Sequence, residues 1–531
     1  MNKRQSSILP FLNIPLILAV ILGIIPWISL VIILANITSA LSLIFLLVVI
    51  SGLGYLPLTL FGFLQSKIKL RLAFAPAIGF ILLSAYFALA SRLTIPLRPV
   101  FWLFCILGLI SSSLFFRDLY SHRKDPVPLG FILVIISIIL ALIFYRPSLK
   151  VNGVLHEDGR YSWIDVDTTY TMGVAVSVRM SSPPFRPGMF KADLASYHFG
   201  SYAISGFLSA TTGIQIADSL RALHGLGLIV LFLAAIAFSR SIAEIFGVQK
   251  LAAPFGVLGL FFALGYPEIS TKIIESLAFI KEITQLIPPE ISDPNTFYTA
   301  HSNLWSLISL ISVIGLLASE WRSKLEINKK LWVLGLIAAH IVPLNFYAGL
   351  GSCGILAGVN LISNWKHLKA WIYTGVIFSL MLAFFAVMGT FSSTTTLFAI
   401  DSEFYKNFFD LYLWIYFGLG ISVYAFRYIK QQNSNPLALA LILSCIGYMM
   451  IYVLVKPIGS SDNRYGLVIL LRLLSMMSFI AVSYPLGRLI EGDSKALHQE
   501  TIHFFIIFKT ISILFAGIIF ISSLILVFRN Y

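Results

Sequence analysis

Long runs of apolar residues, separated by short polar segments, follow one another along almost the whole chain. Most runs reach about 18 residues, the length at which an α-helix can cross the hydrocarbon core of a bilayer. The pattern predicts about fifteen membrane-spanning helices. We expect them near 9–34, 38–64, 72–91, 99–116, 128–145, 222–239, 251–267, 303–319, 331–349, 350–364, 371–391, 409–426, 436–455, 465–485 and 504–527. Gly349, Gly351 and Gly354 interrupt the pattern between 331 and 364 and suggest a break there.

Two polar segments are much longer than the other connections, and they organise the chain. Long ordered loops in a compact protein usually carry function. The pattern therefore predicts an all-α polytopic membrane protein with two structured loops. Its five segments are an N-terminal bundle over 1–145, a first large loop over 146–221, two spans over 222–267, a second large loop over 268–302 and a C-terminal bundle over 303–531.

Composition supports the membrane class. Hydrophobic residues make up 58% of the 531 residues and charged residues only 11%, whereas soluble domains carry about 25% charged residues. The net charge of +14 suits nucleic acid, but no basic stripe is interleaved with aromatic residues, so we expect no nucleic-acid partner. Cys105, Cys353 and Cys445 are too dispersed for a disulfide framework or a cysteine metal site. No phosphate-binding glycine loop or zinc-protease motif occurs, and we expect neither metal nor cofactor.

The basic residues indicate an orientation. With a cytoplasmic N-terminus, twenty Lys and Arg residues fall in inside loops and five in short outside loops. Such a bias sets the topology of multi-pass proteins. Both large loops then lie on the extracytoplasmic side of the plasma or inner membrane. We expect the chemistry on that face.

The first large loop is dense in polar and aromatic residues. Asp167 is expected to cap a helix that begins at about Thr168, and Ser181-Ser-Pro-Pro to end it. A second helical stretch near Tyr197 has apolar residues that suit an element lying on the membrane surface. The second loop contains an amphipathic helix, in which isoleucine and leucine recur at helical spacing over 273–287.

Three features of the first loop resemble one enzyme family. An acidic stretch, Asp165-Val-Asp167-Thr-Thr-Tyr170, is followed by the turn Ser182-Pro-Pro-Phe-Arg-Pro187 and by Tyr197-His-Phe-Gly200 ahead of the next span. This arrangement is similar to the bacterial GT-C glycosyltransferases, in particular the subgroup with several spans before the main outer loop. The resemblance implies transfer of a sugar from a polyprenyl-phosphate donor to an envelope glycan or lipid acceptor. It also implies that Asp167 acts as the general base, with Asp165 as the second candidate.

Other side chains are candidates for substrate binding. Tyr197 and His198 suit an acceptor or a donor phosphate, or else belong to an interfacial aromatic belt. Charges within or beside spans are costly and are functional candidates, and an arginine fork matches phosphate oxygens. The complete set of binding candidates is Tyr170, Arg186, Tyr197, His198, His301, Arg464 and Arg472.

Two other functions remain open. An O-antigen polymerase or ligase would use lipid-pyrophosphate donors and rely on arginine and histidine, for which Arg179, Arg186 and His198 are available. A transporter or flippase would move a lipid-linked sugar without forming a glycosidic bond.

Overall fold

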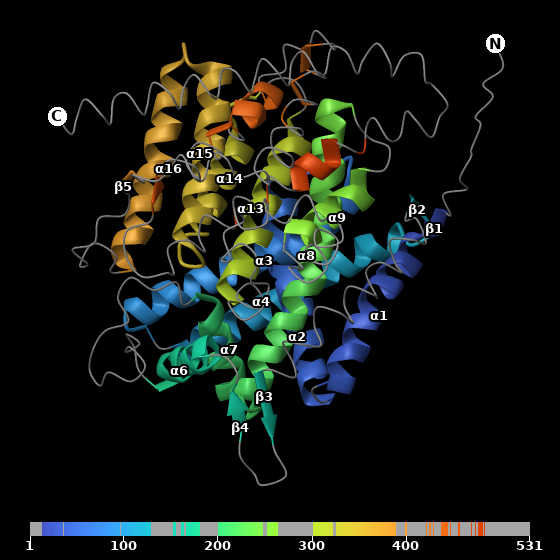
Figure 1. Cartoon of the computed structure of the whole chain (residues 1–531), viewed down its shortest axis with the longest axis vertical. Coiled ribbons are helices and arrows are strands. Elements are labelled where there is room, and N and C mark those ends of the chain that lie inside the picture. The colour runs from blue at the N-terminus through green and yellow to red at the C-terminus, as the bar shows by residue number, and fades with distance from the viewer. Residues whose placement is uncertain are drawn as a thin grey trace, which may run out of the picture. The chain divides into compact units, whose positions relative to one another are not determined.

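The computed structural model is mostly helical (Figure 1). It describes residues 13–34, 37–95, 97–128, 152–155, 161–163, 166–180, 200–247, 252–263, 301–321, 325–388, 399–400, 421, 424–425, 428–429, 437–443, 446–447, 455–456, 469, 473, 476–481 and 483. The chain divides into two compact units. The first unit contains 1–238, 295–320 and 326–394, and the second contains 239–294, 321–325 and 395–531.

The helices follow the apolar runs of the sequence. They are α1 (Leu16–Leu34), α2 (Ile37–Leu60), α3 (Ile68–Arg92), α4 (Leu97–Ser121), α6 (Val166–Met180), α7 (Gly200–Thr212), α8 (Ile216–Phe246), α9 (Ala252–Ala263), α13 (His301–Glu320), α14 (Lys329–Ala339), α15 (Phe346–Asn364) and α16 (Leu368–Val387). Short antiparallel strand pairs add to the expected all-α architecture. They are β1 (Asn13–Pro15) with β2 (Pro126–Pro128), β3 (Asn152–Leu155) with β4 (Tyr161–Trp163), and β5 (Ala399–Ile400) with β6 (Val455–Lys456).

Six helices within the described part of the chain are long and apolar enough to cross a membrane: α2, α3, α4, α8, α15 and α16. The chain is therefore a multi-pass α-helical membrane protein. The total of fifteen spans stays a prediction. The spans expected at 128–145, 409–426, 465–485 and 504–527 lie wholly or mostly outside the described residues, as does half of the span expected at 436–455. The amphipathic helix expected within 268–302 lies outside them too.

Glycines let α2 pack closely against two neighbours. A Cβ on Gly54 would lie 1.8 Å from the Ala75 carbonyl oxygen of α3, and one on Gly52 would lie 2.0 Å from the Gly108 carbonyl oxygen of α4. Small residues of this kind allow membrane helices to approach backbone to backbone. Helices α2, α3 and α4 thus form a tightly packed group within the first unit.

The break between α14 and α15 lies earlier than the glycines suggest. Gly349, Gly351 and Gly354 belong to α15, whereas the chain leaves the helix at His340 and resumes at Phe346. Pro343 lies in this connection and has no N–H to continue a helix. Asn345 then caps α15, since its side-chain oxygen accepts a hydrogen bond from Ala348 N at 3.1 Å.

Helix α7 is buried within the protein, whereas the apolar pattern near Tyr197 predicted an element lying on the membrane surface. Every residue from Gly200 to Ser209 is buried, and α7 packs against α3, α4, α6 and α13. Its buried serines explain the difference, because they are small enough for close helix packing although hydropathy scores them as polar. Ser205 and Ser219 pair their hydroxyl groups at 2.8 Å.

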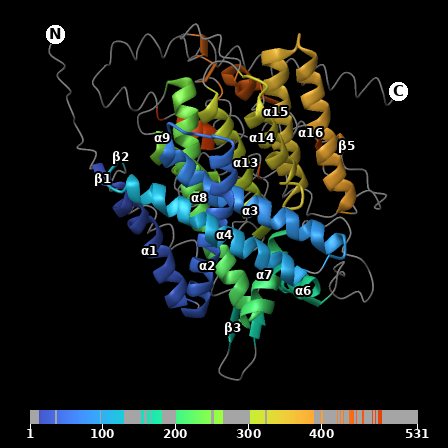
Figure 2. The same ribbon diagram turned by 180° about the vertical axis from the view of Figure 1, so that it is seen from behind.

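Hydrogen bonds join neighbouring helices of the first unit at both ends of the helices. At one end, Leu64 N donates to Glu320 Oε2 at 2.9 Å, and Tyr373 Oη of α16 donates to Leu331 O of α14 at 3.0 Å. At the other end, Gly200 N donates to Pro343 O at 3.3 Å, and Arg92 Nη2 donates to Met388 O at 3.2 Å. We call these the Glu320 end and the Pro343 end. Figure 2 shows α14, α15 and α16 side by side between them.

The second unit has its own close contacts. Gly256 of α9 approaches Ser239, where an added Cβ would lie 1.9 Å from the serine Oγ. Tyr424 donates its hydroxyl hydrogen to Met477 O, and its ring centroid lies 4.3 Å from that of Phe246.

Candidate functional sites in the first unit

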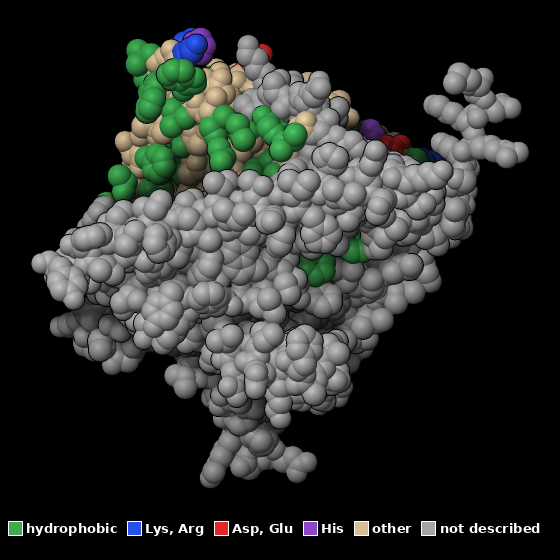
Figure 3. All heavy atoms as spheres, turned by 45° about the horizontal axis from the view of Figure 1, so that its top comes forward, with side chains coloured by type: hydrophobic (Ala, Val, Ile, Leu, Met, Phe, Trp, Pro, Cys, Tyr) green, Lys and Arg blue, Asp and Glu red, His purple; other side chains and the backbone are tan. Residues whose placement is uncertain are grey.

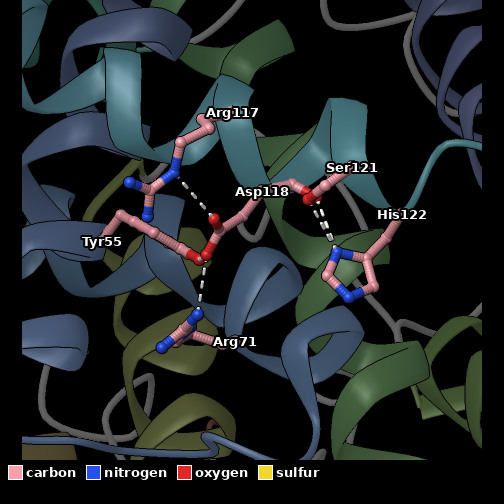
Figure 4. A network of polar contacts seen from close by, with 6 residues as sticks. All are labelled: Tyr55, Arg71, Arg117, Asp118, Ser121 and His122. Atoms are coloured by element: carbon pink, nitrogen blue, oxygen red, sulfur yellow. Dashed lines mark hydrogen bonds and ion pairs between the residues drawn. The ribbon is translucent and has the colours of Figure 1, made fainter.

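Asp118, near the end of α4, is the centre of a buried polar network at the Glu320 end (Figure 4). Arg71 Nη2 of α3 donates to its Oδ2 at 2.8 Å, and Tyr55 of α2 donates its hydroxyl hydrogen to the same oxygen. The Arg71 guanidinium lies 4.8 Å from the centroid of the Tyr55 ring. One carboxylate therefore connects α2, α3 and α4.

Burial sets the energetic weight of each contact in this network. The Arg71 and Asp118 side chains are 7% and 13% exposed, whereas Arg117, which donates to Asp118 Oδ1 at 3.3 Å, is 68% exposed. An exposed ion pair contributes about 0–1 kcal/mol. Breaking a buried one leaves an uncompensated charge at a cost of about 3–5 kcal/mol. The Arg71–Asp118 pair therefore carries most of the electrostatic energy.

The Asp118 carbonyl also ends α4. Ser121 Oγ donates to it at 3.0 Å, and His122 Nδ1 lies 2.9 Å from it (Figure 4). A carbonyl oxygen only accepts, so His122 Nδ1 carries a hydrogen when this bond forms. His122 N also donates to this oxygen at 3.2 Å, so one carbonyl accepts backbone and side-chain hydrogen bonds where α4 ends.

Glu320, the last residue of α13, organises a second cluster at the same end. Its carboxylate accepts from Leu64 N at 2.9 Å and forms an ion pair with Lys330 of α14. Leu64 has a φ of 51°, in the left-handed region that costs a non-glycine residue about 1–2 kcal/mol. Lys67 Nζ donates to Ser319 O at 3.1 Å. The cluster ties the turn between α2 and α3 to α13 and α14.

Sequence reasoning missed Tyr55, Asp118 and Glu320, and it assigned Arg71 to a polar loop. Arg71 lies instead inside α3 and is buried. The signal was available, because a charge within an apolar run is expensive unless it has a partner. Its partner lies 47 residues away, a distance that helical periodicity does not bridge.

The predicted catalytic and binding residues fall mostly elsewhere. Helix α6 begins at Val166, so Asp167 and Tyr170 lie in its first turns, and Asp167 is inside the helix rather than at the cap ahead of it. His301 is the first residue of α13. Asp165, Arg186, Tyr197, His198, Arg464 and Arg472 lie outside the described residues.

The helix that carries Asp167 is held against α7. Val174, Ala175 and Val178 of α6 are buried, and a Cβ on Gly206 of α7 would lie 2.4 Å from the Ala175 carbonyl oxygen. A carboxylate in the first turn of a helix is favoured by the free N–H groups and by the helix dipole. The ionised form of such a side chain can accept a proton from a substrate hydroxyl.

Helix α7 in turn is anchored near the Pro343 end. Its Gly200 N donates to Pro343 O, and its Phe207 ring stacks on Phe87 of α3 with centroids 5.1 Å apart. The α6–α7 pair is therefore built into the membrane helices of the first unit.

Within the described residues, no group of three or more His, Cys, Asp and Glu side chains is arranged to hold a metal ion. No family model matches this chain, and no curated protein and no solved structure matches it.

Proposed function

We propose that this protein is an integral-membrane glycosyltransferase of the GT-C type, which uses a polyprenyl-phosphate-linked sugar and glycosylates an envelope glycan or lipid. The observation that supports it best is an aspartate in the first turn of α6, a helix packed on α7, which is anchored near the Pro343 end of the membrane helices. A general base must be held in a defined position relative to its substrate, and a helix packed into the fold provides such a position.

The charge bias gives this proposal its orientation. Lys67, Lys69, Lys330, Lys366 and Lys369 lie in or beside the connections at the Glu320 end. Positively charged connections favour the cytoplasmic side. The Pro343 end then faces outward, and the N-terminus is cytoplasmic. The membrane is the plasma membrane, or the inner membrane of a cell with two.

The proposed reaction is an inverting displacement. Asp167 takes the proton of the acceptor hydroxyl while that oxygen attacks the anomeric carbon. The new glycosidic bond forms as the bond from the anomeric carbon to the phosphate oxygen breaks, and polyprenyl phosphate leaves with the electron pair. Arg464 and Arg472 would neutralise the phosphate, and Asp165 is the alternative base.

The remaining predicted residues would hold the two substrates. Tyr170, Tyr197, His198, Arg186 and His301 supply hydroxyl, imidazole and guanidinium groups that hydrogen-bond sugar or phosphate oxygens.

The test uses full-length protein in proteoliposomes with radiolabelled polyprenyl-phosphate sugars and crude envelope acceptor, followed by thin-layer chromatography. We expect transfer by the wild type and a loss of about 10²-fold or more in Asp167→Asn. Glu326→Gln, which alters an exposed carboxylate at the Glu320 end, is the matched control and should keep full activity.

One outcome would reassign the base, and two would contradict the proposed function. Full activity in Asp167→Asn with loss in Asp165→Asn moves the base to Asp165. Label that crosses the bilayer unchanged indicates a transporter. Turnover of lipid-pyrophosphate donors alone, lost in Arg179→Gln or Arg186→Gln, indicates a polymerase or ligase.

A further inference from the structure

The turn between α15 and α16 exposes large apolar side chains next to basic ones. Trp365, Leu368 and Trp371 are 62%, 74% and 55% exposed, and Lys366 and Lys369 are exposed among them. Figure 3 shows Lys and His side chains gathered at the tip of this helix pair, with hydrophobic side chains directly below. We call residues 364–371 the Trp–Lys turn.

Local contacts hold the Trp–Lys turn in one shape. Trp371 Nε1 donates to Trp365 O at 2.9 Å, so one indole spans the turn. His367 N donates to Asn364 O, and Ala370 N donates to His367 O, both at 2.9 Å. Lys366 Nζ lies 5.5 Å from the centroid of the Trp365 ring, within cation–π range. A ligand that binds here meets a surface that is already ordered.

The charge of the turn has one sign. Residues 364–371 contain two lysines and no aspartate or glutamate. Lys366 and Lys369 contrast with Lys330, which is paired with Glu320. Their ammonium groups attract an anion, and their aliphatic stems can lie along apolar surface while the charge reaches a polar layer.

Helix α16 fixes the depth of the turn in the bilayer. It is a candidate membrane span, and only a minority of its residues are buried within the protein. Ile372, Val376, Leu382 and Val387 along it are 50%, 39%, 47% and 37% exposed. This surface suits lipid acyl chains. Tryptophan is enriched at the headgroup level, so we expect the two lysines, just before and within the first turn of α16, to reach the lipid phosphates.

We propose that the Trp–Lys turn is a binding site for anionic phospholipid in the leaflet at the Glu320 end. The two ammonium groups hold the phosphate and the added negative charge of the headgroup, and the indole rings and α16 contact its upper acyl chain. A protein partner would leave the continuous apolar surface of α16 unexplained. Each basic residue near a charged membrane surface strengthens binding by about fivefold, so the two lysines together should give a preference for anionic over zwitterionic lipid of up to about 25-fold.

The test is fluorescence quenching by brominated phospholipids in vesicles that contain the full-length protein. Brominated phosphatidylglycerol or brominated phosphatidylcholine is mixed with unbrominated lipid, and tryptophan emission is measured against mole fraction. The chain has nine tryptophans. Subtracting the emission of Trp365→Phe/Trp371→Phe from that of the wild type isolates the two indoles of the turn.

We expect the brominated anionic lipid to quench these indoles more strongly than the brominated zwitterionic lipid. The ratio of the two quenching strengths should fall toward one in Lys366→Gln/Lys369→Gln and as the salt concentration increases. Lys366→Arg/Lys369→Arg should retain it. Lys124→Gln, which removes an exposed lysine just beyond the end of α4, should leave it unchanged. Equal quenching by both lipids overturns the proposal, as does a preference that survives the double glutamine change. If neither brominated lipid quenches the two indoles, another protein surface covers the turn. That result also overturns the proposal.

Discussion

Replacement of Asp118 by asparagine is the sharpest probe of the first unit. The substitution keeps the shape of the side chain and an oxygen that can still accept from Tyr55, but it removes the charge that faces Arg71. The Arg71 side chain is 7% exposed, so water replaces the lost carboxylate poorly. Breaking a buried pair costs about 3–5 kcal/mol. We expect about 3 kcal/mol, the lower limit, because the Tyr55 ring still faces the guanidinium and contributes about 0.5–2 kcal/mol.

The measurement is equilibrium unfolding in mixed micelles with increasing dodecyl sulfate, followed by circular dichroism. Arg117→Gln is the matched control, because it removes the exposed member of the same network and should cost less than about 1 kcal/mol. The combined variant Tyr55→Phe/Arg71→Met/Asp118→Leu removes every polar group together. It should recover most of the stability, since an apolar replacement of a buried pair is often neutral or stabilising.

Two results would refute this reasoning. An Asp118→Asn protein within about 0.5 kcal/mol of the wild type means that the pair is solvated or unformed. A combined variant less stable than Asp118→Asn means that the polar groups contribute net stability beyond their mutual compensation.

Three further predictions concern close packing and caps. Gly54→Leu should separate α2 from α3 and prevent stable folding. The control Gly23→Ala, with nothing within 4 Å of the added Cβ, should leave thermal stability unchanged or slightly higher. Equal melting temperatures for the two variants would contradict the close packing of α2 on α3. Asn345→Ala removes the cap of α15 and should cost about 1 kcal/mol in the same unfolding assay, while no change would place the helix start elsewhere. Gly206→Leu should displace α6 from α7, because the new side chain meets the Ala175 carbonyl. We expect protein that still elutes as a monodisperse peak but has lost sugar transfer. Retained transfer would show that catalysis does not depend on the packing of α6 on α7.

The positions of the helices in the first unit were readable from the sequence because each apolar run is long. Residues 72–91 were expected as a span, and α3 occupies Ile68–Arg92. Helix α8 extends beyond the expected 222–239 to Ile216–Phe246. Hydropathy misses the extra turns because they are polar, yet Asp218 and Arg221 pair there at 3.1 Å on one helix face.

The candidate sites were less readable because they depend on contacts across the fold. Periodicity indicates which residues share a helix face, but it does not show that Asp118 faces Arg71 or that Glu320 holds the backbone of Leu64. The helix that carries Asp167 could be predicted locally: the sequence suggested a start at about Thr168, and α6 begins at Val166. The catalytic role of Asp167 is proposed from the composition of the loop and from the family resemblance.

The glycine contacts of α2 have a consequence for the order of biogenesis. All three helices that they join lie between Ile37 and Ser121, so their contacts are local in sequence, and local contacts form fast. Domains fold from the N-terminus as synthesis proceeds at about 5–20 residues per second. The α2–α3–α4 group can therefore assemble in the bilayer seconds before α7 leaves the ribosome. Helix α7 then docks on a template that already exists, which makes the early helices a scaffold for the segment that follows α6.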